Sequence, residues 1–417
     1  MSGVSGSAAG FGGRARVMVA IHAAYTAATL LAVTFLSIFL WRAGHDLTLI
    51  ALFTGLTTLT IPLAFVLNGM VFRRAGAGTS IRLGLAALGL TYLAVIGLGQ
   101  NAVHWVLPLG LLRGLGEGWY WAGYHLATYD STDESNRDRY FGAQAAVNWL
   151  LSALLPPVAG AIIVAGSRWG GAYFGYQVVF GAAALVLAGA VVLAGRLECG
   201  QRPTFSLREA VVVGRRNAPW RWVTWARLAD GFSGSLSGLV LTVLTFLLLR
   251  NEQQVGTFNG LLGLIGVAIS VGLAAFMRPR YRIPVALVGA AMLVLSTLVL
   301  PLYLSATALF AYGVLRAFGG PLHGNALAPI ALQVIDRDPR ARDRRYEYIV
   351  HQELCLGAGR VLSIGAFLLL AAPVDQLLLS RIAIVVCGAA PMVILAMFAQ
   401  IRASAPAADT RALPAAA

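Results

Sequence analysis

The chain consists largely of apolar stretches, each roughly 20 residues long, and we count twelve of them along the sequence. A helix of about 20 apolar residues is long enough to cross the hydrocarbon core of a bilayer. Hydrophobic residues make up 58% of the 417 residues and charged residues only 12%, whereas soluble domains carry about 25% charged residues. The sequence therefore predicts an all-α integral membrane protein.

Short polar segments separate the predicted spans, and one longer segment divides them into two groups of six. The spans are expected at 17–41, 47–69, 80–100, 103–128, 141–165, 173–195, 221–249, 255–277, 283–303, 305–332, 347–372 and 377–400. The expected domains are a disordered tail at 1–13, a six-helix bundle at 14–196, a connection at 197–219, a second six-helix bundle at 220–402 and a disordered tail at 403–417. Within the connection, the stretch from Leu207 to Gly214 is expected to form a short helix that lies along the membrane.

The second six spans repeat the layout of the first six. Four landmarks recur in order at an offset of roughly 203 to 208 residues, which indicates two structural repeats. The pairs are Trp41-Arg42 with Leu249-Arg250, Arg73 with Arg278, Leu112-Arg113-Gly114-Leu115-Gly116 with Leu315-Arg316-Ala317-Phe318-Gly319, and Arg139-Tyr140 with Arg345-Tyr346. Parallel duplication of six helices is typical of one large class of secondary transporters.

Arginine is distributed unevenly between the two ends of the spans. The net charge is +14, and most arginines lie in alternate loops, whereas the opposite loops hold only Arg42, Arg168, Arg250 and Arg381. Loops rich in Lys and Arg stay in the cytoplasm. We therefore expect both termini to be cytoplasmic, in the inner membrane of a bacterium, and we expect no binding of nucleic acid.

Several polar side chains lie well inside the predicted spans, where a charged group costs a few kcal/mol unless it faces protein or a water-filled cavity. Helical spacing places many of them on shared faces, such as His22 with Thr26, and Arg113 with Glu117 and Trp121. The candidate substrate-binding residues are His22, Thr26, Arg113, Trp121, Tyr124, Gln144, Asn148, Arg316, His323 and Arg360. The candidate proton-coupling residues are Glu117, Asp230 and Glu353.

Several of these candidates also have a structural interpretation. Arg113 with Glu117, and Glu353 with Arg360, are spaced so that they can neutralise each other. His323 is equally compatible with packing, and Asp230 can pair with Arg227. Arg316 has no acidic neighbour within one turn of its own helix, which makes it the best single candidate for contact with an anion; the alternative is a carboxylate partner from another helix.

The chain resembles the major facilitator superfamily over its whole length. The loop after the second span, Gly69-Met70-Val71-Phe72-Arg73-Arg74-Ala75-Gly76, is similar to the family pattern G-x-L-a-D-r-x-G-R-k, with Arg73 in place of the aspartate. Arg113-Gly114-Leu115-Gly116-Glu117-Gly118 resembles R-x-x-Q-G-x-G, and Pro156-Pro157-Val158-Ala159-Gly160-Ala161 resembles the antiporter pattern G-P-x-x-G-G. The resemblance implies two six-helix bundles related by a pseudo-twofold axis, alternating access, and a role for Arg113 in proton coupling.

The function expected is secondary transport of a small organic solute, with proton-coupled export favoured by the antiporter pattern and an organic anion slightly favoured as substrate. The first alternative is efflux of cationic or lipophilic drugs. An alternative from another class is a membrane sensor or lipid scramblase on the same fold. Enzymatic activity, a metal and a cofactor are not expected, and we expect a monomer.

Overall fold

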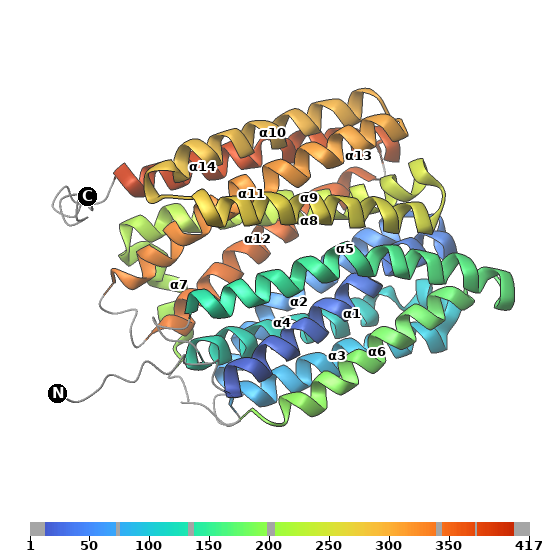
Figure 1. Ribbon diagram of the computed structural model, residues 1–417, viewed down its shortest axis with the longest axis horizontal. Coiled ribbons are helices and arrows are strands. Elements are labelled where there is room, and N and C mark those ends of the chain that lie inside the picture. Colours follow the sequence, from blue (N-terminus) through green and yellow to red (C-terminus); the bar gives the residue numbers. More distant parts are fainter. Residues whose placement is uncertain are drawn as a thin grey trace, which may run out of the picture. The chain divides into compact units, whose positions relative to one another are not determined.

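The structure, a computed structural model, describes residues 13–71, 76–131, 137–197, 205–338, 344–371 and 373–403, and the described residues form helices joined by short turns (Figure 1). The long helices of the first half are α1 (Gly13–Gly44), α2 (Leu47–Val71), α3 (Ala77–Leu98), α4 (Val106–Ser131), α5 (Arg137–Gly170) and α6 (Phe174–Ala194). A short helix, α7 (Leu207–Arg216), follows. The second half holds α8 (Ala218–Leu249), α9 (Glu252–Phe276), α10 (Arg282–Leu302), α11 (Ala306–Asp336), α12 (Arg345–Ala371), α13 (Gln376–Gly388) and α14 (Ala390–Ala403).

Ten stretches of the described helices are long and apolar enough to cross a membrane. One of them, Ala77–Thr128, contains both α3 and α4, and α11 lies outside the ten. The multi-pass architecture is therefore confirmed, while the number twelve stays a prediction. Most of the tails and the loop residues Arg73 and Arg74 lie outside the described residues.

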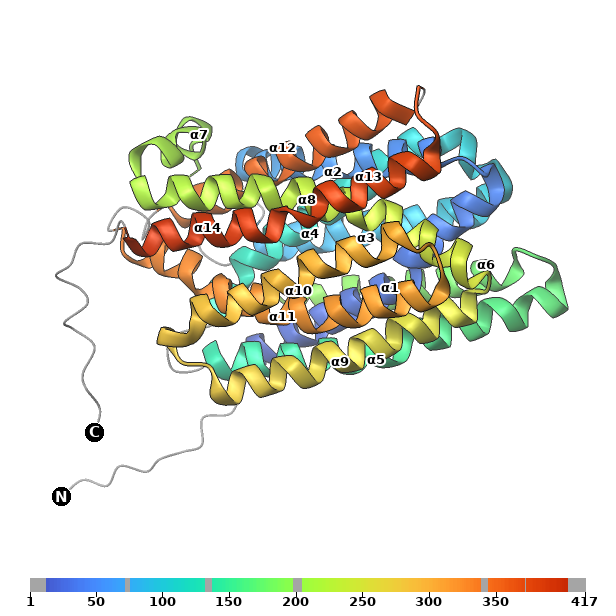
Figure 2. The same cartoon turned by 90° about the horizontal axis from the view of Figure 1, so that it is seen from above.

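The chain divides into two compact units. Unit 1 comprises Met1–Leu49, Leu63–Pro203 and Arg250–Leu264, and unit 2 comprises Ile50–Pro62, Thr204–Leu249 and Ile265–Ala417. Within unit 1, α3 contacts α4 and α6, and α1 contacts α5 and α6. Within unit 2, α10 contacts α11, and α8 contacts α12, α13 and α14 (Figure 2).

The turns after α1 and α8 share one geometry. His45 and Arg250 are the two residues other than glycine with positive φ among the described residues, at 51° and 58°. The side chain of the residue after each one accepts a hydrogen bond from a backbone N–H group at the start of the next helix. Asp46 Oδ1 accepts from Thr48 at 2.8 Å, and Asn251 Oδ1 accepts from Gln253 at 2.8 Å. A side-chain oxygen at this position satisfies an N–H group that lacks a partner at the beginning of a helix. The recurrence of this turn agrees with the predicted repeat.

Glycines set a close helix crossing in each unit. A Cβ atom on Gly84 of α3 would lie 2.7 Å from the carbonyl oxygen of Gly116 of α4, and one on Gly289 of α10 would lie 2.8 Å from that of Gly319 of α11. Small residues allow helix backbones to approach closely in membranes. Glu117, the residue after Gly116, lies about 100° further around α4, on a face beside the α3–α4 crossing.

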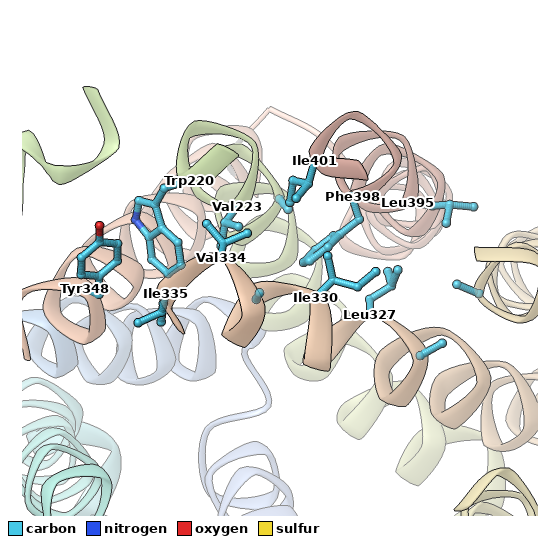
Figure 3. Close-up of a cluster of buried hydrophobic side chains, with 14 of the residues drawn as sticks. Trp220, Val223, Leu327, Ile330, Val334, Ile335, Tyr348, Leu395, Phe398 and Ile401 are labelled. Carbon is cyan, nitrogen blue, oxygen red and sulfur yellow. The ribbon is translucent and has the colours of Figure 1, made fainter. Parts of the chain in front are cut away.

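An apolar core in unit 2 surrounds the start of α8 (Figure 3). The indole of Trp220 is 1% exposed, and its ring centroid lies 4.8 Å from that of Tyr348, edge to face. The other members of the cluster come from neighbouring helices and include Ala286 and Ala290 of α10, Leu327, Ile330 and Val334 of α11, and Leu395, Phe398 and Ile401 of α14. The core therefore joins five helices of the second half: α8, α10, α11, α12 and α14.

The last predicted span, 377–400, is interrupted, which differs from the expectation of one helix. The helix breaks at Ala389, between α13 and α14. Pro391 has no N–H group, so the carbonyl of Cys387 lacks its usual helical donor. Ser233 of α8 donates a hydrogen bond to this carbonyl oxygen at 3.1 Å, and the backbone N–H of Ala389 donates to it as well.

Candidate functional site

The polar face of α4 is the base of a buried cluster in unit 1. Arg113, Glu117 and Trp121 lie one helical turn apart on this face, as expected from their spacing. The side chains of Arg113 and Glu117 are 12% and 10% exposed. Such burial requires partners for both charges.

The Glu117 carboxylate receives hydrogen bonds from two directions. The hydroxyl of Tyr25 on α1 donates to Glu117 Oε2 at 2.5 Å, and Arg113 Nη2 donates to Oε1 at 3.4 Å. Trp121 Nε1 donates to the Tyr25 hydroxyl at 3.0 Å. Charge-assisted hydrogen bonds of this kind are among the stronger ones in proteins. A proton that reaches Glu117 would therefore disturb Tyr25 and Arg113 directly.

His22 forms a second hydrogen-bonded group beside the first. Its Nδ1 lies 2.7 Å from the Tyr120 hydroxyl, and its Nε2 lies 3.5 Å from Asn148 Nδ2. Because an amide nitrogen only donates, Nε2 accepts in this arrangement and Nδ1 carries the proton. Thr26 donates to Asn148 Oδ1 at 3.1 Å, which fixes the amide of Asn148 on α5.

Aromatic rings surround both groups. The rings of Tyr25 and Tyr120 stack at 3.8 Å between centroids, and those of His22 and Tyr124 stack at 4.6 Å. Trp121 meets Tyr25 edge to face at 5.5 Å. Gln144 donates to the hydroxyl of Tyr124. The structure thus brings together all eight candidates that were predicted in this half of the chain: His22, Thr26, Arg113, Glu117, Trp121, Tyr124, Gln144 and Asn148.

Unit 2 holds an ion pair on α8 and another on α12. Arg227 Nη1 lies 3.3 Å from Asp230 Oδ2, and Arg360 Nη1 lies 3.8 Å from Glu353 Oε2. The Asp230 side chain is 49% exposed, and that of Glu353 is 14% exposed. The expected pairs therefore form, and their distances lie on either side of the 3.4 Å between Arg113 Nη2 and Glu117 Oε1 in unit 1.

Arg316 and His323 differ in their surroundings, although both lie on α11. The Arg316 guanidinium lies 5.5 Å from the ring centroid of Tyr312, and among the described residues no carboxylate pairs with it. His323 Nε2 donates to the carbonyl of Pro391 at 3.0 Å, so His323 supports the break between α13 and α14. Ser233, one turn after Asp230, also serves this break through its contact with Cys387.

Sequence reasoning missed three polar groups. Tyr25 was not a candidate, although it lies three residues after His22 and so shares its face. Glu252, at the start of α9, is 4% exposed; Arg42 Nε and the Tyr176 hydroxyl each lie 2.6 Å from its Oε1. His351 is 7% exposed and contacts α7. Glu252 lies before its predicted span and His351 near the start of its own, so neither stood out as a polar group in the middle of a helix.

Relatives with significant sequence similarity have descriptive names without an activity. The chain is 28% identical over 360 residues to "Uncharacterized protein YqgE" of Bacillus subtilis (strain 168), covering 85% of this chain and 82% of that protein. It is also 28% identical over 172 residues to "Uncharacterized protein in sodM 3'region" of Geobacillus stearothermophilus, covering 41% of this chain and 78% of that protein.

Solved structures of transporters share the fold. A POT family transporter in complex with a thioalcohol-conjugated peptide has a TM-score of 0.69 at 12% identity, with 93% of this chain and 96% of that chain covered. A bacterial homologue of the human lysosomal transporter Spinster, inward-facing and unoccupied, has a TM-score of 0.65 at 14% identity, with 93% and 96% covered. The human organic anion transporter MFSD10 has a TM-score of 0.62 at 14% identity, with 92% and 98% covered.

The family model of the Major Facilitator Superfamily matches residues 17–344, which is well over half of the chain. Together with the helical architecture and the transporter structures, this match supports a multi-pass secondary transporter with a small-molecule substrate. The chain belongs to the Major Facilitator Superfamily.

Proposed function

We propose that this chain transports a small organic anion together with a proton, and that Arg316 supplies the principal contact with the anion. The observation that carries this proposal is the unequal pairing of the arginines inside the helices. Arg113, Arg227 and Arg360 each have a carboxylate partner. Among the residues that the structure describes, Arg316 has the Tyr312 ring in place of a carboxylate, which leaves its positive charge for a substrate.

The carboxylates supply the proposed proton coupling. Protonation of Glu117 would remove the negative charge that Arg113 now neutralises, and Glu353 stands in the same relation to Arg360. A guanidinium released in this way attracts an anion, so proton and anion strengthen each other's binding. Because coupling between two binding events is reciprocal, the two ligands are then expected to move in the same direction.

A second candidate is efflux of a cationic or lipophilic compound, and the surroundings of Glu117 favour it. Three aromatic rings gather at this carboxylate, because Tyr25 donates to it and the rings of Tyr120 and Trp121 pack against Tyr25, and aromatic faces attract cations. A cation and a proton would compete for Glu117, and such competition is required if the cation is exported in exchange for a proton. The resemblance of the α5 segment Pro156–Ala161 to the antiporter pattern supports this direction.

The two candidates predict opposite effects of pH on binding. The experiment is thermal stabilisation of the purified protein by a panel of organic anions, cations and lipophilic drugs at two pH values, one mildly acidic and one near neutral. A ligand that binds only the folded state stabilises it by about 2.7 kcal/mol at a hundredfold excess over its Kd. Anions that bind more tightly at the acidic pH, and whose binding is lost in Arg316→Gln, are the expected result.

The matched control is Arg168→Gln, which removes an exposed arginine outside the candidate residues. Cations that bind more weakly at the acidic pH, with unchanged affinity in Arg316→Gln, would replace the first candidate by the second. Hits must then be tested for flux in proteoliposomes. A ligand that binds but is not moved would contradict both transport proposals and favour a sensor.

A further inference from the structure

The helix α7 lies in the connection between the two repeats, directly before a candidate membrane span. This helix lies outside the ten apolar stretches, and only Asn217 separates it from α8, where a candidate span begins at Ala218. A single residue spans less than about 4 Å, so the end of α7 is held next to the start of this candidate span.

One face of α7 is fixed to α12. His351 Nδ1 donates to the carbonyl of Ala210 at 2.8 Å, and the backbone N–H of Ser206 donates to Glu347 Oε1 at 3.1 Å. A Cβ atom on Gly214 would lie 2.8 Å from His351 Nε2, so the two helices approach closely there. These contacts set the rotation of α7 about its own axis and thereby determine which face is left outside.

The outer face of α7 combines apolar and basic side chains. Leu207 and Val211 are one helical turn apart and are 42% and 57% exposed. Arg215 continues the same stripe and Arg208 flanks it, and both are exposed. Within the described part of the chain, neither arginine forms an ion pair, whereas Arg216 pairs with Glu209 at 2.6 Å.

We propose that this outer face, defined by Leu207, Arg208, Val211 and Arg215, binds the surface of a membrane that contains anionic phospholipid. A basic helix with apolar residues on the same face lies in the interfacial plane, with its apolar side chains among the acyl chains and its arginines at the phosphates. Each arginine near an anionic membrane surface contributes about 1 kcal/mol, which is about fivefold in affinity. The positive charges of Arg208 and Arg215 complement an anionic lipid surface, and the position beside α8, a candidate span, brings them close to one.

The test uses the full-length protein in an uncharged detergent, titrated with short-chain phosphatidylglycerol or phosphatidylcholine, with the unfolding temperature as the readout. The wild type should be stabilised at lower concentrations of phosphatidylglycerol than of phosphatidylcholine. In the double variant Arg208→Gln/Arg215→Gln, the phosphatidylglycerol concentration for half-maximal stabilisation should rise about tenfold or more, since two arginines are removed. The response to phosphatidylcholine should stay the same.

The matched control is Arg168→Gln/Arg250→Gln, which removes the same charge from loops predicted on the opposite side of the membrane and should leave the midpoint almost unchanged. An equal response of wild type and α7 variant to phosphatidylglycerol would overturn the proposal. Equal stabilisation by soluble glycerol phosphate would also overturn it, because the site would then be one for free anions. In a third variant, Leu207→Gln/Val211→Gln, the response to both lipids should weaken.

Discussion

The crossings α3–α4 and α10–α11 are alike in packing and unlike in charge. In both, a glycine on each helix lets the backbones meet, at Gly84 with Gly116 and at Gly289 with Gly319. The arginine also recurs, as Arg113 and Arg316. One turn later, however, the first repeat has Glu117 and the second has Gly320.

This difference shows that duplication has kept the helix packing while the polar faces have diverged. Glu117 neutralises Arg113 within unit 1 and is itself held by Tyr25. Gly320 has no carboxylate, so among the described residues of unit 2 no carboxylate neutralises the charge of Arg316. The repeat therefore explains the fold, and the departure from the repeat supplies the proposed anion contact.

The shared packing is tested by replacing a glycine at the helix crossing of either unit with a large residue. Gly84→Leu and Gly289→Leu should each destabilise the protein by about 3 kcal/mol or more, because the new side chain meets backbone atoms of the partner helix. Thermal unfolding in detergent measures the effect. Gly97→Leu is the control, since nothing lies within 4 Å of a Cβ atom there. Similar losses in all three variants would contradict the proposed close crossings.

The hydrogen bond that Tyr25 donates to Glu117 in unit 1 is tested by Tyr25→Phe. The substitution removes the hydrogen bond to Glu117 Oε2, and a hydrogen bond to a charged group contributes about 2 kcal/mol. The free energy of unfolding should fall by about this amount. Tyr303→Phe is the control because Tyr303 is 70% exposed. A loss no larger than that of the control would mean that Tyr25 does not hold the carboxylate.

The break between α13 and α14 has no counterpart in α6, which is continuous from Phe174 to Ala194. Ser233→Ala should remove the side-chain donor of the Cys387 carbonyl, which is then left with the N–H of Ala389 alone, and cost about 1 kcal/mol. The neighbouring Ser235→Ala serves as the control. Equal stability of the two variants would show that the carbonyl does not depend on Ser233.

The smallest effect on stability is expected from a substitution in α7, which lies outside the candidate spans. Desolvation acts to raise the pKa of Glu209, but hydrogen bonds from Arg344 and Arg216 outweigh it and lower this pKa. A carboxyl whose pKa is lowered by folding stabilises the protein above its unfolded pKa of about 4.3. That stabilisation is lost as the pH falls through the lower folded value.

The difference in unfolding temperature between wild type and Glu209→Gln should therefore be present at near-neutral pH and shrink below about pH 4. The control variant is Asp375→Asn, because Asp375 is an exposed carboxylate that caps α13 and asparagine caps a helix about equally well. A wild-type advantage over Glu209→Gln that grows toward low pH would contradict the assignment.

Much of this architecture could be predicted from the sequence, because the length of an apolar stretch determines whether a helix formed by it can span the membrane. The predicted start or end of most helices lies within a few residues of the observed one. The break at Ala389 escaped prediction although Pro391 is visible in the sequence, because a proline inside an apolar run is compatible with a continuous helix, as Pro62 in α2 shows. Tyr25 and Glu252 escaped because their partners come from other helices, which sequence spacing does not reveal.

The most direct test of the account is the affinity for an anion after the missing carboxylate has been restored. Nothing lies within 4 Å of a Cβ atom at Gly320, so Gly320→Glu should place a carboxylate one turn from Arg316, as Glu117 is placed from Arg113. The Kd for an anion found in the panel should rise about tenfold or more, since a hydrogen bond to a charged group contributes about 2 kcal/mol. Gly320→Gln should change it far less. Equal affinities in wild type, Gly320→Glu and Gly320→Gln would contradict the role of Arg316.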